Sequence, residues 1–160
     1  RTTEELRESE SLRDHVIIAG YGLTGRNLAH SLTQIGTRYI IVDLNTENVR
    51  DAARQGEPAC FGDVTSAEVL EHLGAAEASE LVIAINDPDA TVRAIGAARH
   101  SAPDLRITVR TAYDADVKRL EEAGATRVVA AEAAAADAII DLVLGNIGDS
   151  PEEQSGPTCT

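Results

Sequence analysis

Short apolar runs alternate with longer amphipathic segments along most of this chain of 160 residues. The apolar runs are aliphatic or β-branched nearly throughout, which is typical of parallel strands that are buried on both faces of a sheet. They predict six strands, at His15–Gly20, Tyr39–Asp43, Pro58–Phe61, Leu81–Ile85, Leu105–Arg110 and Arg127–Ala130.

The segments between these strands have the apolar spacing and the end signals of helices. Leu28, Leu32 and Ile35 recur at helical spacing in the first segment, and Gly124 closes the fifth. We expect helices at Thr24–Ile35, Thr46–Gln55, Ser66–Leu73, Pro88–His100, Ala115–Ala123 and Glu132–Leu144. Because strands and helices alternate, the sequence predicts an α/β fold, a Rossmann-like doubly wound parallel sheet of six strands with helices on both faces.

The last helical segment contains the alanine-rich run AAEAAAADAII. Apolar residues continue after it at helical spacing, so we expect a tightly packed helix and not a low-complexity tail. Residues 1–14 are polar and charged, and residues 146–160 are rich in Gly, Pro, Ser and acids, which is typical of a disordered tail. The folded domain is therefore expected to span residues 15–145.

Acidic residues outnumber basic ones, with 27 Asp and Glu against 14 Lys and Arg and a formal net charge of -13. Nucleic acids and anionic membranes are bound through clustered Lys and Arg, so this charge argues against a nucleic-acid partner. Cys60 and Cys159 lie in unlike surroundings and the histidines have no ligand spacing. Neither a disulfide nor a metal site is expected, and a reducing cytosol fits best.

A glycine motif, G-x-G-x-x-G, follows the first predicted strand and opens the first predicted helix. Its glycines are Gly20, Gly22 and Gly25. In such a motif the first glycine permits a tight turn, the second lets the backbone approach a pyrophosphate, and the third lets helix and strand pack closely. The helix N-terminus then faces the anion with free N–H groups, so the motif predicts a phosphate site that needs no lysine.

Asp43 ends the second predicted strand, 18 residues after Gly25. A carboxylate at this place can accept hydrogen bonds from both ribose hydroxyls and would repel a 2′-phosphate. This favours NAD or an adenosine nucleotide over NADP as the ligand. The alternative is that Asp43 only caps the following helix.

Polar residues also follow the next three strands, and all would open onto the same edge of the sheet. Asp63 could reach an adenine or could cap the third helix, and Asn86 follows the fourth strand. Arg110 is a cation at the end of an otherwise buried strand. It could pair with a phosphate, with an acid such as Asp87, or with a partner subunit.

A catalytic arrangement is not recognisable in the sequence. Short-chain dehydrogenases use a Tyr-x-x-x-Lys pair, whereas the only lysine, Lys118, lies five residues after Tyr113. A hydride-transfer enzyme also needs a proton donor and a place for its substrate. The predicted nucleotide-binding fold uses the length of this chain, so it leaves no second domain for a substrate. We expect a non-enzymatic receiver of a nucleotide signal. A small NAD-dependent oxidoreductase or a domain of one, a methyltransferase, and a module that only dimerises are the alternatives.

Four longer stretches are more specific than the glycines. They are HVIIAGYGLTGRNLA, YIIVDLN, GEPACFGDVTSAEVLEHLGAAEASELVIAINDP and LRITVRTAYDADVKRLEEAGATRVV. Together they resemble the nucleotide-binding RCK domain (regulator of potassium conductance, also called Trk-N). The resemblance is closest to the version at the cytosolic end of Kef-type potassium/proton antiporters, and it covers residues 15–130.

The resemblance implies a regulatory domain at the cytoplasmic face of the cell membrane, which binds AMP or NAD(H) and controls a potassium or other cation transporter, or a channel. It also implies a homodimer. Residues 1–14 would be the linker from a transmembrane transporter portion of the same chain.

The resemblance further implies binding roles for residues at the strand ends and in the glycine loop. The phosphates would be held by Gly20, Gly22 and Gly25, with backbone contacts from Leu23 and Thr24. The ribose would be held by Asp43 with its neighbours Leu44 and Asn45, and the adenine by Asp63 and Val64. Near the phosphates or the second ribose would lie Ile85, Asn86 and Arg110.

Overall fold

Six parallel strands form one sheet in the order β3-β2-β1-β4-β5-β6 in the computed structural model, which describes residues 12–148. The strand order reverses between β1 and β4, so the predicted doubly wound sheet is confirmed. The strands are β1 (Val16–Ala19), β2 (Tyr39–Asp43), β3 (Ala59–Phe61), β4 (Glu80–Ile83), β5 (Arg106–Thr111) and β6 (Arg127–Ala130).

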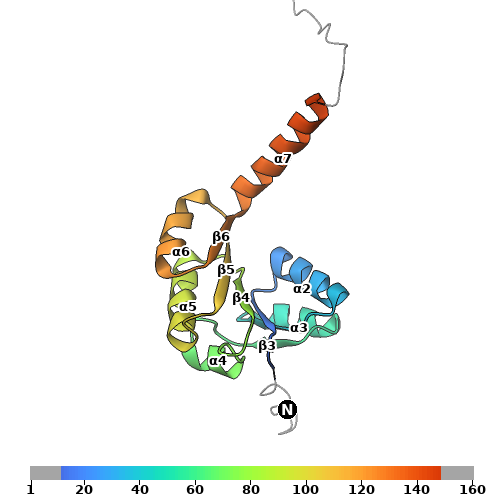
Figure 1. Cartoon of the computed structure of the whole chain (residues 1–160). Helices are drawn as coiled ribbons and strands as arrows, with labels where there is room; N and C mark the ends of the chain where they lie inside the picture. Colours follow the sequence, from blue (N-terminus) through green and yellow to red (C-terminus); the bar gives the residue numbers. More distant parts are fainter. Residues whose placement is uncertain (1–11, 149–160) are drawn as a thin grey trace, which may run out of the picture.

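A helix follows each strand, and the helices cover the sheet from both sides (Figure 1). They are α2 (Leu23–Ile35), α3 (Thr46–Arg54), α4 (Ala67–His72), α5 (Pro88–Ser101), α6 (Val117–Ala123) and α7 (Ala131–Gly148), with a 3-10 turn (Asp114–Asp116) before α6. Each predicted helix is present. α7 continues to Gly148, three residues into the segment expected to be a disordered tail, and the rest of that segment lies outside the described residues.

Local capping explains where several helices begin. The side chain of Asn45 accepts hydrogen bonds from the first backbone amides of α3, and Ser66 does the same for α4. Asp87 caps α5, whose first residue is Pro88, a position where proline costs no hydrogen bond. Gly124 ends α6 in the left-handed conformation that glycine adopts without strain.

Alternate residues of the central strands bury two separate apolar layers. Ile17 of β1 faces the layer formed with α4, α5 and α6, whereas Ile18 faces the layer formed with α2 and α3. Beyond α2, this second face of the sheet is less covered, and Val129 of β6 is 46% exposed there. The described core therefore leaves part of one sheet face open over β5 and β6.

The helix α7 projects away from the rest of the chain (Figure 1). The prediction of a helix is confirmed, but the prediction that it is tightly packed is wrong. α7 follows β6 without a loop and continues past the edge of the sheet, so in the described part of the chain little lies along it. Its large apolar side chains are exposed, namely Ile139, Ile140, Leu142, Val143, Leu144 and Ile147.

Candidate functional site

The glycine loop joins β1 to α2 through two very close backbone approaches. Gly20 has φ 106°, and a Cβ built on it would lie 2.6 Å from the carbonyl oxygen of Ala84. A Cβ on Gly25 would lie 1.9 Å from the carbonyl oxygen of Gly20. By contrast, a Cβ on Gly22 would meet no atom within 4 Å. The fold therefore requires the first and third glycines, while the second leaves open space above the loop.

The first turn of α2 offers unoccupied hydrogen-bond donors. Gly22 occupies the N-cap position, where no side chain caps the helix, and the first turn contains no acidic residue. Leu23 and Thr24 are exposed at this end. Because the first amides of a helix have no partner within it, this N-terminus has the donors and the dipole direction that suit an anion.

Asp43 fastens the glycine loop to the end of β2. Its Oδ2 atom accepts a hydrogen bond from the backbone amide of Tyr21 at 2.8 Å and another from the Nδ2 atom of Asn48 at 3.0 Å. Its Oδ1 atom accepts from the amide of Asn45 at 2.8 Å. The cap of α3 is Asn45 and not Asp43, so the capping alternative for Asp43 is wrong.

The buried ring of Tyr21 also anchors this glycine loop. It is 3% exposed, and burial raises the pKa of its hydroxyl. The guanidinium of Arg26 lies 4.3 Å from the ring centroid and also pairs with Asp51 of α3 at 3.3 Å. The glycine loop is thus tied to both β2 and α3 while its outer side stays open.

A cavity of about 210 Å³ lies beside Asp43 at the carboxyl edge of β1 to β4. It brings together five residues that the resemblance assigned to the ribose, adenine and phosphate region, namely Asp43, Leu44, Asp63, Val64 and Ile85. Its lining is mostly apolar at Ala19, Val42 and Ala90, which suits the flat face of a base.

Asp63 has a local structural role in this cavity. Its Oδ1 atom accepts hydrogen bonds from the hydroxyl of Thr65 at 2.7 Å and from the amide of Thr65 at 2.9 Å. These bonds lower the pKa of Asp63 below its usual value of 3.8. The helix cap is Ser66, so Asp63 shapes the turn before α4 and does not cap the helix.

A second cavity, of about 230 Å³, adjoins the first and shares Ile85 and Asp87 with it. Arg110 donates a hydrogen bond to the Oδ1 atom of Asn86 at 2.7 Å across this cavity. Asp87 instead accepts from the amide of Ala90, and Arg110 forms no ion pair within residues 12–148. The suggested pairing of Arg110 with Asp87 is therefore wrong.

Several residues of the site were missed by sequence reasoning. Asn48 lines neither cavity but bonds to Asp43 from the first turn of α3, and Thr111, Ala112, Tyr113 and Asp116 are among the residues that line the second cavity. In the sequence, only the position of Arg110 at the end of a strand pointed to residues 111–116 as part of the site. Of the residues assigned from the sequence, the glycine loop and Asn45 line neither cavity but lie next to them through Gly20, Tyr21 and Asp43.

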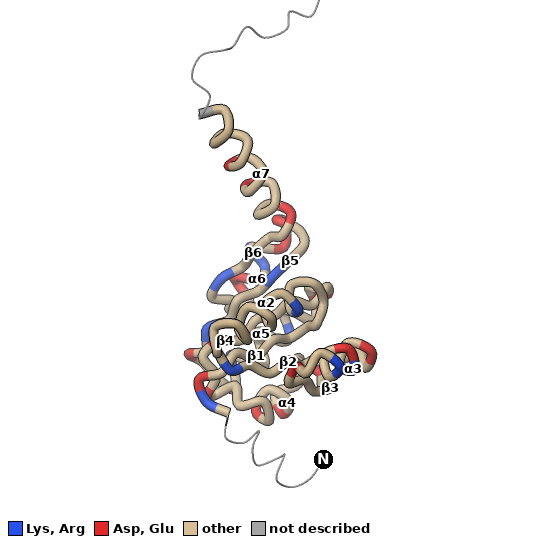
Figure 2. Tube along the Cα trace, turned by 90° about the vertical axis from the view of Figure 1, so that its right-hand side faces the viewer, with Lys and Arg blue, Asp and Glu red and all other residues tan. Residues whose placement is uncertain are grey.

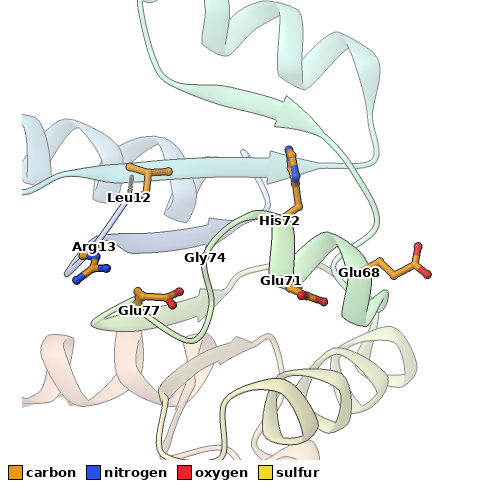
Figure 3. Close-up of a pocket in the computed structure, with 7 residues that line it drawn as sticks. All are labelled: Leu12, Arg13, Glu68, Glu71, His72, Gly74 and Glu77. Carbon is orange, nitrogen blue, oxygen red and sulfur yellow. The ribbon is translucent and has the colours of Figure 1, made fainter. Parts of the chain in front are cut away.

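A larger cavity, of about 390 Å³, lies elsewhere, at the residues where the described chain begins (Figure 3). Glu68, Glu71 and Glu77 line it together with Arg13 and His72. Three carboxylates disfavour a phosphate, so this cavity does not suit a nucleotide. Acidic residues are also spread over α3 and α7 (Figure 2), and no helix within residues 12–148 has the length and apolar character to cross a membrane.

Residues 16–131 match the TrkA-N domain family. The putative K⁺ efflux antiporter KefB of Alkalimonas amylolytica is 36% identical over 122 residues, which are 76% of this chain and 18% of that protein. The glutathione-regulated potassium-efflux system protein KefC of Escherichia coli is 32% identical over 127 residues, 77% of this chain and 20% of that protein. The chain thus spans about a fifth of these antiporters.

A solved structure, the Kef CTD of Shewanella denitrificans in its AMP-bound form, superimposes with a TM-score of 0.71 at 27% identity. The match covers 85% of this chain and 82% of that one. The predicted resemblance is confirmed by sequence and by fold, and the chain belongs to the TrkA-N domain family, with Kef-type potassium efflux antiporters among its relatives.

Proposed function

We propose that this chain is the cytosolic regulatory domain of a Kef-type monovalent cation:proton antiporter or of a related channel, and that it senses an adenine nucleotide. The observation that carries this proposal is the pair of adjoining cavities beside a glycine loop that Asp43 already holds in place. The AMP-bound Kef relative has the same fold, which supports AMP as one ligand.

The ligand runs along the carboxyl edge of the sheet. The phosphate lies at the first turn of α2, against Gly20, Gly22 and Gly25 and the amides of Leu23 and Thr24. The ribose lies against Asp43, with Leu44 and Asn45 beside it, and the adenine enters the cavity of Asp63 and Val64. A dinucleotide such as NAD(H) extends past Ile85 toward Asn86 and Arg110. The negative charge of Asp43 disfavours the 2′-phosphate of NADP.

The hydrogen bonds of the charged groups in the groove formed by the two cavities support a regulatory role over a catalytic one. Asp43 holds the glycine loop, Asp63 holds the turn at Thr65, and Asp87 caps α5. Arg110 is bonded to Asn86. A general acid or base has to be available to a substrate proton, and each of these groups already serves the local fold.

A homodimer is supported by the exposed surface of α7. This helix carries six large exposed apolar side chains, and β6 leaves Val129 exposed on the open sheet face. Apolar surface that is concentrated on one projecting helix is typical of a protein interface. We infer that two copies of the chain associate through α7. The transmembrane transporter portion of the same chain would join at the segment before residue 12, at the cytoplasmic face of the membrane.

A backbone contact links the groove formed by the two cavities directly to α7, in addition to the pairing of β5 with β6. Ala112 lines the second cavity, and its carbonyl oxygen accepts a hydrogen bond from the amide of Glu132 in the first turn of α7 at 3.4 Å. A nucleotide that contacts residues 111–113 therefore favours one direction of α7 over another. The dimer and the attached transporter respond by a shift in population.

Thermal unfolding against a ligand panel tests the proposal. A ligand at about a hundred times its Kd stabilises the folded state by about 2.7 kcal/mol. We expect AMP or NAD(H) to stabilise the chain and NADP not to do so, with the effect reduced in Asp43→Asn but kept in Asp104→Asn, an exposed acid that lines neither cavity. Stabilisation by S-adenosylmethionine alone would indicate a methyltransferase, and substrate-dependent oxidation of NADH would indicate an oxidoreductase. A lack of response to every nucleotide would overturn the proposal.

A further inference from the structure

The carboxylate of Asp43 has most of its hydrogen-bonding capacity in use before any ligand arrives. Oδ2 accepts from Tyr21 and Asn48, and Oδ1 accepts from Asn45. An ionised carboxylate offers about four acceptor positions, two on each oxygen. Three of them are occupied, so one position stays open, and it lies on Oδ1.

The three donors differ in what fixes them. The donors from Tyr21 and Asn45 are backbone amides, whose places follow from the glycine loop and from the start of α3. The third donor is the side chain of Asn48, a partly buried residue in the first turn of α3. Its own amide is held by the cap at Asn45. Asn48 is therefore the member of this set that a substitution can remove.

We propose that Asn48 is a positioning residue for Asp43, which limits that carboxylate to a single ribose hydroxyl. This inference rests on the proposed nucleotide site. The amide of Asn48 fills the acceptor position on Oδ2 that a second hydroxyl would use, while the backbone amides of Tyr21 and Asn45 fix the orientation of the carboxylate. The expectation from the sequence, that Asp43 accepts both hydroxyls, does not fit these bonds.

Removal of Asn48 should change the pattern of ribose recognition as well as the affinity. In Asn48→Ala the second position on Oδ2 becomes open, so both hydroxyls can reach the carboxylate. Alanine is the best helix former, and the N-cap Asn45 is unchanged, so α3 is retained. A residue that only stabilised the fold would weaken all ligands equally and leave their ratio unchanged.

The experiment compares AMP with 2′-deoxy-AMP and 3′-deoxy-AMP by calorimetric titration of the 160-residue chain. A hydrogen bond to a charged group contributes about 1.5–3 kcal/mol, or about 10- to 150-fold in Kd. For the wild type we expect one deoxy analogue to bind at least about tenfold more weakly than AMP and the other to bind within about twofold of it. In Asn48→Ala the two analogues should bind within about threefold of each other.

Asn27→Ala is the matched control, because Asn27 is exposed on α2 and its side chain has no hydrogen bond within the described residues. It should keep the wild-type ratio. Equal weakening of both analogues in the wild type would overturn the single-hydroxyl inference without any variant. An unchanged ratio in Asn48→Ala would overturn the role of Asn48. Failure of AMP itself to bind the wild type would overturn the proposed function, and the inference with it.

Discussion

The carbonyl oxygen of Gly20 occupies the space in which a side chain on Gly25 would begin, 1.9 Å from the position of its Cβ. The first and third glycines of the motif are therefore in direct contact, and this contact sets the distance between β1 and α2. Gly22, between them, has no such neighbour. The motif separates into two positions that serve the fold and one that faces open space, where the proposed ligand would lie.

Alanine substitutions at the two kinds of glycine should give opposite results. Gly25→Ala forces backbone apart in the buried loop, and we expect it to lower the free energy of unfolding by about 3 kcal/mol or more. Gly22→Ala has space and an ordinary φ of -88°, so its stability should fall by no more than about 1 kcal/mol, the usual cost of alanine at an N-cap. The new methyl group in Gly22→Ala should weaken AMP binding. Urea unfolding and calorimetric titration measure the two effects, and a stable Gly25→Ala variant would contradict this division.

Removal of the Asp43 carboxylate should cost stability as well as affinity. In the structure Asp43→Ala leaves the amide of Tyr21 without its acceptor, and an unsatisfied group of this kind costs about 1–3 kcal/mol. Chemical unfolding in the absence of nucleotide measures this loss. Unchanged stability would mean that water replaces the carboxylate at the loop.

Arg99 should be one of the more sensitive positions outside the site. Its guanidinium donates to the carbonyls of Gly124 at 2.8 Å and of Pro103 and Leu105, and to the hydroxyl of Thr126. We expect Arg99→Ala to lower the free energy of unfolding by about 2–3 kcal/mol, because several carbonyls lose a charged donor. Arg93→Ala, at an exposed arginine of the same helix, is the control and should change stability by less than about 0.5 kcal/mol. An equal loss of stability in both variants would show that the positive charge on the helix, and not these hydrogen bonds, stabilises the fold.

Acidic substitutions on α7 should separate the proposed dimer. We expect the double variant Ile139→Asp with Leu142→Asp to raise the dimer dissociation constant by at least about tenfold, since charge is costly in an apolar interface. Asp141→Asn changes a polar residue of the same helix and should leave association unchanged or stronger. Sedimentation equilibrium gives the constants. A wild-type chain that is monomeric at high concentration would contradict the dimer.

The contribution of Asp63 to stability should depend on pH. Thr65 lowers the pKa of Asp63 in the folded state below 3.8, so the carboxylate stabilises the fold at pH values above the unfolded pKa. This contribution is lost as the pH falls through the folded pKa. We expect Asp63→Asn to be less stable than wild type at about pH 7 and nearly equal to it at about pH 2. Unfolding curves at both values measure the difference, and a constant difference would contradict the role of ionisation.

The sequence predicts well those features that depend on a short stretch of neighbouring residues. Apolar runs and the glycine spacing are local, and the doubly wound sheet follows from the alternation of strands and helices. The bond from Tyr21 to Asp43 joins positions 22 residues apart, and no local pattern marks it. Asp87 was one of three partners that the sequence left open for Arg110, and the contact with Asn86 that the structure shows has no local pattern either.

The exposure of α7 has a different origin. Its apolar spacing correctly predicts a helix, but spacing carries no information on what the apolar side chains pack against. Because β6 leads into the helix without a turn, the chain has no residues with which to fold α7 back onto the sheet. The pattern therefore predicts the helix but does not predict how the helix packs.

The direct junction of β6 and α7 also turns small movements into large ones. α7 has 18 residues, which at a rise of 1.5 Å per residue gives a rod about 27 Å long that is held at one end. A rotation of about 10° at Ala131 moves the far end, at Gly148, by about 5 Å for a rod of that length. The contact between Ala112 and Glu132 lies beside Ala131, at the base of this rod. Under the proposed function, a small displacement of this contact by a bound nucleotide would therefore become a displacement several times larger at the far end of α7.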